Sequence, residues 1–143
     1  VYNRLKKDLE VVDGMSDPEY VKRLTAQATF RDRLVSAMDA HGLDALFYPH
    51  QRRLVVPATI DPDQVERNGF MASSTGLPAI TFPGGFSPVT ATAPIGVPVG
   101  IEFLGRPFSE AKLISLAYAF EQATKHRTPP TSTPSLPGEK FTY

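Results

Sequence analysis

The sequence of 143 residues contains no cysteine and carries no net charge. Without cysteine there is no disulfide framework, no thiolate nucleophile and no cysteine-bound metal. The 15 Lys and Arg residues offset the 15 Asp and Glu residues, so the broad positive field that attracts nucleic acid or an anionic membrane is missing. We therefore expect neither nucleic acid nor a membrane as a partner.

Long apolar runs are also absent from the sequence. No stretch approaches the roughly 20 apolar residues of a membrane-spanning helix. The first ten residues, VYNRLKKDLE, lack the apolar centre of a signal peptide. A cytoplasmic location is the default expectation. The sequence begins with Val1 instead of Met, which suggests a processed product or a segment cut from a longer protein.

What remains is a chain of ordinary globular composition, with 41% hydrophobic and 21% charged residues, long enough for one core. Apolar residues at three- and four-residue steps predict a helix from Ser16 to His41. Ser16 and Glu19 have the spacing of a capping box, and Gly42 is a typical terminator. A second long helix is expected to begin at Ser109. Its predicted inner face is formed by Leu113, Leu116, Ala117, Phe120 and Ala123.

Three short segments have the pattern of strands. Leu43–Tyr48 is an apolar run that Pro49 would end, Ala79–Phe82 is followed at once by Pro-Gly-Gly, and Val99–Leu104 alternates. We expect the last two to pair antiparallel, with Ala79–Phe82 in the centre. The predicted fold class is α/β, a small mixed sheet covered by the two long helices.

The remaining segments are connections and a tail. A long loop is expected from His50 to Arg67, and a short helix of small residues from Asn68 to Gly76. Residues 128–143 are rich in Pro, Ser and Thr and poor in apolar side chains, which is typical of an extended tail. Residues 1–127 are therefore predicted to form a single domain.

No residue pattern predicts a catalytic or metal site. Ser73 and Ser74 are adjacent, but a serine without a neighbouring base is a weak nucleophile. The three histidines lie far apart in the sequence without the spacing of a metal face. A triad assembled through space, from Ser73 or Ser74 with His50 and Asp61, stays open because such triads are defined by geometry. We expect no catalytic residue, no metal and no cofactor in this chain.

Two motifs carry a resemblance to a known family. GLPAITFPGG at residues 76–85 and VGIEFLGRPFSEAKLISLAYAFEQA at residues 99–123 resemble the closing segment of the amidase signature family, serine hydrolases that cleave carbon–nitrogen amide bonds with a Ser-Ser-Lys set. The resemblance implies a partial amidase-signature fold. In that family the catalytic set lies in an earlier Gly- and Ser-rich run, which these 143 residues do not contain.

The resemblance implies a function in two tiers. A full-length parent would hydrolyse amides through a serine acyl-enzyme, with its N-terminal catalytic part as the partner of this chain. The chain alone is expected to be inactive. The alternative is a free-standing binding module that kept the fold and forms a homodimer through exposed apolar surface.

The resemblance also assigns local roles. The stretch after the strand at Leu43 approaches the substrate cleft in related enzymes, so Tyr48, Pro49 and His50 are expected to form part of a pocket wall. The junction at Arg106 is architectural in the family. We expect Arg106 to pair with Glu110 and Phe108 to pack under the following helix.

Overall fold

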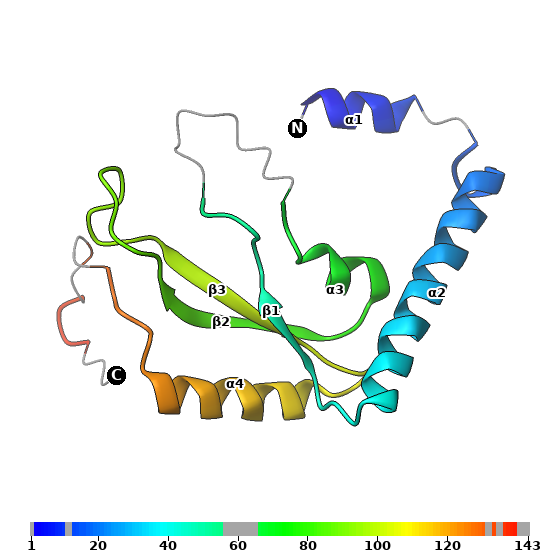
Figure 1. Cartoon of the computed structure of the whole chain (residues 1–143). Helices are drawn as coiled ribbons and strands as arrows, with labels where there is room; N and C mark the ends of the chain where they lie inside the picture. Colours follow the sequence, from blue (N-terminus) through cyan, green and yellow to red (C-terminus); the bar gives the residue numbers. More distant parts are fainter. Residues whose placement is uncertain (1, 11–12, 56–65, 131–132, 134–135, 140–143) are drawn as a thin grey trace.

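The computed structural model describes residues 2–10, 13–55, 66–130, 133 and 136–139. In chain order the elements are α1 (Tyr2–Leu9), the 3-10 helix η1 (Gly14–Ser16), α2 (Pro18–Ala40), β1 (Leu46–Pro49), α3 (Phe70–Thr75), β2 (Ala79–Phe86), β3 (Pro98–Leu104) and α4 (Glu110–Thr124). Helices and a small sheet are thus combined in one chain (Figure 1). The predicted α/β class is confirmed.

The sheet has three strands in the order β1-β3-β2, and both pairs are antiparallel. The predicted antiparallel pairing of the last two strands is therefore confirmed. Two details of the prediction were wrong. The central strand is β3, not the strand at Ala79, and the sheet in the described part of the chain is antiparallel rather than mixed, because each edge strand runs opposite to β3.

Strand β2 does not stop at the Pro-Gly-Gly sequence, as the sequence predicted. It continues to Phe86, with an irregularity in the register between Pro83 and Gly85. Proline is tolerated there because β2 is an edge strand, where a missing N–H need not break the ladder. Gly84 is required by space, since a Cβ atom at this position would lie 2.3 Å from Cγ1 of Ile101.

The N-cap of α2 lies one residue after Ser16, the N-cap that the sequence predicted. Asp17 is its N-cap, with its carboxylate accepting a hydrogen bond of 2.9 Å from the backbone N–H of Glu19, and Pro18 occupies the first turn. Ser16 belongs to η1 instead. An aspartate at the N-cap satisfies one of the free N–H groups of the first turn just as a serine would, so the sequence left the cap ambiguous.

Helix α4 packs on one face of the sheet, whereas α2 lies beside the end of the sheet and contacts α3 (Figure 1). Both long helices were predicted to cover the sheet. Only α4 does so, and the prediction for α2 was wrong. The α4 face carries an aromatic cluster formed by Phe47, Phe82, Phe103 and Phe120, with ring centroids 4.8 to 6.4 Å apart. Leu113 and Ala117 of α4 are buried as predicted, while Ala123 is exposed.

The turn between β3 and α4 differs from its predicted contacts. Arg106 pairs with Asp39 of α2, its Nη2 2.9 Å from Oδ1, and also donates to the carbonyl of Leu43 at 2.5 Å. The predicted pairing with Glu110 is wrong. Phe108 does not pack under the helix, because it is 96% exposed with a φ of 61°. Arg106 instead joins the end of α2 to the sheet.

The core formed by the residues that the structure describes is small. The buried apolar residues in the described part are Met38, Leu77, Phe82, Leu104, Leu113 and Ala117. The chain exposes 10992 Å² of accessible surface, where a compact monomer of 15.6 kDa is expected to expose about 7,300 Å². In the described residues, large apolar side chains such as Phe47, Ile114 and Tyr118 leave much surface open.

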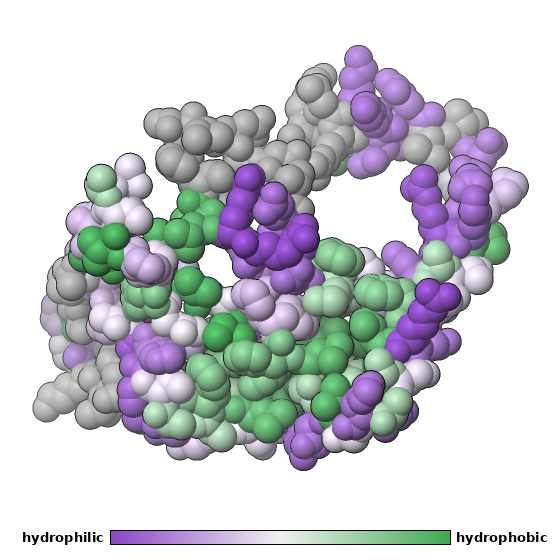
Figure 2. All heavy atoms as spheres, viewed as in Figure 1, coloured by the Kyte–Doolittle hydropathy of each residue, from purple (hydrophilic) through white to green (hydrophobic). Residues whose placement is uncertain are grey.

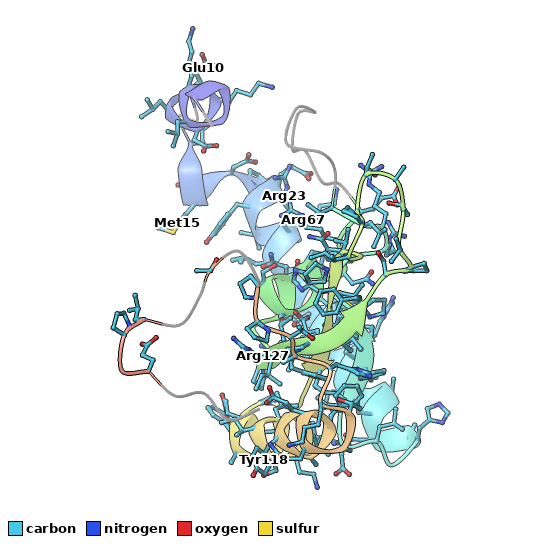
Figure 3. The ribbon with its side chains drawn as sticks, turned by 90° about the vertical axis from the view of Figure 1, so that its left-hand side faces the viewer. Glu10, Met15, Arg23, Arg67, Tyr118 and Arg127 are labelled. Carbon is cyan, nitrogen blue, oxygen red and sulfur yellow. The ribbon has the colours of Figure 1, made fainter. Side chains whose placement is uncertain are left out.

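Much of this open surface is apolar. Figure 2 shows apolar residues gathered across the lower middle of one face, where the sheet and α4 lie. Met15 before α2 and Tyr118 on α4 are both exposed, and Figure 3 shows their side chains pointing away from the sheet. Neighbouring exposed apolar side chains, such as Ile114 and Tyr118 one turn apart on α4, are typical of an interaction face.

Candidate functional site

A row of polar side chains crosses the sheet on the face opposite α4. Tyr48 of β1 and Thr81 of β2 both pair in register with Glu102 of β3. Side chains alternate along strands, so residues in register share a face. The aromatic cluster takes the neighbouring positions on the other face. Glu102 is 4% exposed, which makes it a buried carboxyl group at the centre of the sheet.

Three side chains satisfy this buried carboxylate. The hydroxyl of Tyr48 donates to Oε1 at 2.5 Å, the hydroxyl of Thr81 donates to Oε2 at 3.2 Å, and Nδ1 of His50 lies 2.8 Å from Oε2. An ionised carboxylate only accepts hydrogen bonds, and a buried charge is tolerated when it is paired and hydrogen-bonded. The arrangement therefore gives the Glu102 carboxyl group two hydroxyl donors and one ring nitrogen of His50 within hydrogen-bond distance.

The phenol of Tyr48 is perturbed by the same arrangement. Burial raises the pKa of Tyr48 far above its usual value, and the hydrogen bond to Glu102 and the negative charge of Glu102 raise it further. The phenol consequently stays neutral as a hydrogen-bond donor throughout the physiological range.

His50 is held at the end of β1 by backbone contacts. Its N–H donates to the carbonyl of Gly100 at 3.1 Å, and its carbonyl accepts from the N–H of Asn68 at 2.8 Å. The side-chain amide of Asn68 also donates to the carbonyl of Pro49 at 2.8 Å. The two ends of the connection between β1 and α3 are thereby joined beside the polar row.

A cleft of about 550 Å³ lies next to this cluster. Its wall combines apolar groups from Leu54, Val55 and Val99 with the polar side chains of His50 and Arg52. Of the residues expected in a pocket wall, Pro49 and His50 line this cleft, while Tyr48 lies behind it on Glu102. That the cleft receives a substrate stays a prediction.

Glu102 was not singled out from the sequence. The available signal was a carboxylate in an otherwise apolar strand, VGIEFL. Such a residue is rarely fully buried unless it is paired. Its partners come from other strands, so the pairing only becomes visible once the register is known.

The other candidate groups do not assemble into a triad in the described part of the chain. The hydroxyl of Ser73 donates to the carbonyl of Phe70 within α3 at 3.1 Å, and His50 contacts Glu102. Asp61 lies outside the described residues. His126 packs edge-on against Phe120.

Neither a metal cluster nor a membrane helix is formed by the residues that the structure describes. No group of three or more His, Cys, Asp or Glu side chains comes together there as a possible metal site. None of the helices in that part of the chain combines the length and apolar character needed to cross a membrane.

Comparison with known proteins finds relatives whose names agree with one another. No protein-family model matches the chain. One subunit of the glutamyl-tRNA(Gln) amidotransferase of Desulforudis audaxviator is 32% identical over 128 residues, 85% of this chain and 24% of that protein. Mandelamide hydrolase of Pseudomonas putida is 32% identical over 75% of this chain and 22% of that protein.

A solved structure agrees with both. The native peptide amidase of Stenotrophomonas maltophilia superposes with a TM-score of 0.69 at 34% identity, over 85% of this chain and 23% of that one. The chain belongs to the amidase signature family. It spans about a quarter of the length of these amidase signature relatives. The sheet and helices therefore correspond to a portion of an amidase-signature fold.

Proposed function

We propose that this chain is the C-terminal segment of an amidase-like hydrolase, which cleaves carbon–nitrogen amide bonds through a serine acyl-enzyme. The observation that carries the proposal is the similarity over most of the chain to a mandelamide hydrolase and a peptide amidase. The names of both denote action on amides. The reacting serine of such an enzyme needs an adjacent base.

In this proposal the chain supplies framework and part of the cleft, and the N-terminal catalytic part of the same protein is its partner. The exposed apolar surface over the sheet and α4 supports this, because burying it would extend a core that is small in the described residues. Pro49 and His50 would then stand at the wall of the substrate pocket, with Tyr48 supporting them through Glu102. We propose a cytoplasmic location for the whole, to which the lack of cysteine is no obstacle.

The proposal further holds that the chain alone is catalytically silent. Its paired serines lie on α3, where the hydroxyl of Ser73 is bonded to the helix backbone. In the described part of the chain, α2 contributes Leu24, Gln27, Ala28 and Arg31 to the cleft beside Ser73 and Ser74, and no lysine or histidine lines it to serve as base. A serine in this setting is not activated.

A serine-reactive fluorophosphonate probe tests both parts of the proposal. The purified chain should remain unlabelled, and it should release no ammonia from benzamide or from a peptide amide. A longer polypeptide encoded by the same gene, extended at its N-terminus, should be labelled at a serine outside the 143 residues and should release ammonia. A matched extension with that serine changed to Ala should lose both signals. An extension that is neither labelled nor active would contradict the proposal.

A second candidate function is self-association. The same exposed apolar residues, among them Ile114 and Tyr118 on α4, favour a homodimer of a free-standing binding module. Sedimentation at rising concentration distinguishes the two: a strict monomer argues against the module, and a dimer dispersed by Tyr118→Ser would support it.

A further inference from the structure

We propose that His50 is a substrate-binding residue whose Nε2 atom accepts a hydrogen bond from the N–H of a carboxamide in the cleft, with Glu102 as the positioning residue that fixes the ring. This deepens the proposed function and rests on it for the choice of an amide as the ligand.

The hydrogen bonds of Glu102 determine where the imidazole proton lies. Nδ1 of His50 is 2.8 Å from Oε2 of a carboxylate that is buried and accepts two further hydrogen bonds. An ionised carboxylate has no proton to donate, so Nδ1 must carry the hydrogen in the neutral ring. The lone pair then belongs to Nε2, which becomes an acceptor.

The surroundings of the ring select the edge that faces the cleft. Nδ1 is turned to Glu102, and the ring lies against Gly69, where a Cβ atom would lie 2.2 Å from Cε1 and 2.8 Å from Nε2. The His50 side chain is nevertheless 35% exposed and lines the cleft. Because Gly69 has no Cβ atom, the space beside Nε2 is left open, and we assign the Nε2–Cδ2 edge to the ligand. In the described residues, no hydrogen bond to Nε2 is found.

The cleft offers what a carboxamide needs. An amide presents an N–H donor and a C=O acceptor on the same group. Nε2 of His50 is the acceptor for the N–H, and the guanidinium groups of Arg52 and Arg53 on the same wall are donors for the carbonyl oxygen. Leu54 and Val99 give the cleft an apolar flank for the rest of the ligand. The favoured ligand is therefore a carboxamide with an apolar substituent.

The tautomer and the binding can be measured together by NMR. In the 15N-labelled chain at pH 8, long-range proton–nitrogen spectra should show His50 with its hydrogen on Nδ1. Benzamide should then shift the Nε2 resonance, because its N–H engages the lone pair. Methyl benzoate, which has the same ring and a carbonyl but no N–H, should leave that resonance unchanged. A ring protonated on Nε2, equal responses to both compounds, or no response at saturating benzamide would each overturn the proposal.

Variants distinguish a role of Glu102 in positioning the His50 ring from a purely structural role of Glu102. Glu102→Gln should allow the hydrogen to return to Nε2 and weaken benzamide binding roughly tenfold, as expected for the loss of one charge-assisted hydrogen bond. Tyr118→Phe is the control, since Tyr118 is exposed on α4 and does not line the cleft, and it should keep the tautomer and the benzamide response. Gly69→Ala should displace the ring and abolish the response. A Glu102→Gln chain that stays folded and keeps both signals would contradict the role of Glu102.

Failure of this inference is distinguishable from failure of the proposed function. If the longer polypeptide hydrolyses no amide while His50 responds to benzamide as described, the hydrolase proposal fails and the binding residue stands. If hydrolysis is found and His50 gives no response, only the assignment of His50 is wrong.

Discussion

The hydrogen bond between Tyr48 and Glu102 should stabilise the fold by an amount that depends on pH in a predictable way. Tyr48→Phe removes the hydroxyl that donates to Oε1 at 2.5 Å while keeping the ring. Hydrogen bonds to charged groups contribute about 1.5–3 kcal/mol. Because Tyr48 is only half-buried, we expect the lower end, a loss of about 1.5 kcal/mol in the free energy of unfolding at neutral pH.

This difference should shrink and then change sign in alkali. The pKa of Tyr48 is raised in the folded chain, whereas in the unfolded chain the phenol ionises near its ordinary value of about 10. Above that pH the unfolded state releases a proton that the folded state keeps. The stability of the parent chain therefore falls by about 1.4 kcal/mol per pH unit relative to Tyr48→Phe, which has no such proton. The two proteins should be equally stable near pH 11.

Urea unfolding of both proteins between pH 7 and 11.5, at constant ionic strength, tests this prediction. Other groups titrate in the same range, but they are common to both proteins and cancel in the difference. A gap that is constant from pH 8 to pH 11.5 would show that the phenol is not held neutral by burial and by Glu102. A Tyr118→Phe chain, altered at an exposed tyrosine, should show a gap near zero throughout.

Three further predictions concern the framework. A double-mutant cycle should give a coupling of about 0.5 kcal/mol between Arg106 and Asp39, which is largely exposed, and a coupling near zero between Arg106 and Glu110; the reverse order would restore the pairing expected from the sequence. Leu104→Ala should lower the free energy of unfolding by about 3 kcal/mol, because Leu104 is completely buried, and a loss under 1 kcal/mol in urea unfolding would refute its place in the core. Phe108→Asn should leave stability unchanged or raise it by up to about 1 kcal/mol, since an exposed side chain is lost and asparagine tolerates a φ of 61° better; a clear drop in melting temperature would mean that Phe108 packs after all.

Local patterns were sufficient to predict most of the elements. The apolar periodicity of α2 and α4 and the alternation of β3 come from neighbouring residues, so the sequence predicts them directly. The end of β2 was misjudged because Pro-Gly-Gly usually interrupts a strand. Its tolerance here depends on the edge position of Pro83 and on the space beside Ile101 at Gly84, and neither is a local property.

The sequence predicted only those residues of the candidate site that lie at the edge of the cleft. The sequence pointed to the end of β1, where His50 lines the cleft, and it did so through a family resemblance. It gave no hint that His50 bonds to Glu102, which is 52 residues away in the chain. Likewise, Arg106 pairs with Asp39, which is 67 residues away in the chain. The sequence had suggested the nearby Glu110 as its partner. Contacts between distant segments follow from register and helix placement, which a single sequence does not reveal.

The most direct test of the central idea is reaction of the purified chain with a fluorophosphonate probe, followed by mass spectrometry and an assay for ammonia release from amides. We predict an unmodified chain and no turnover, because the proposed function places the reacting serine outside these 143 residues. Modification at Ser73 or Ser74, with ammonia release that disappears in Ser73→Ala or Ser74→Ala, would contradict the account.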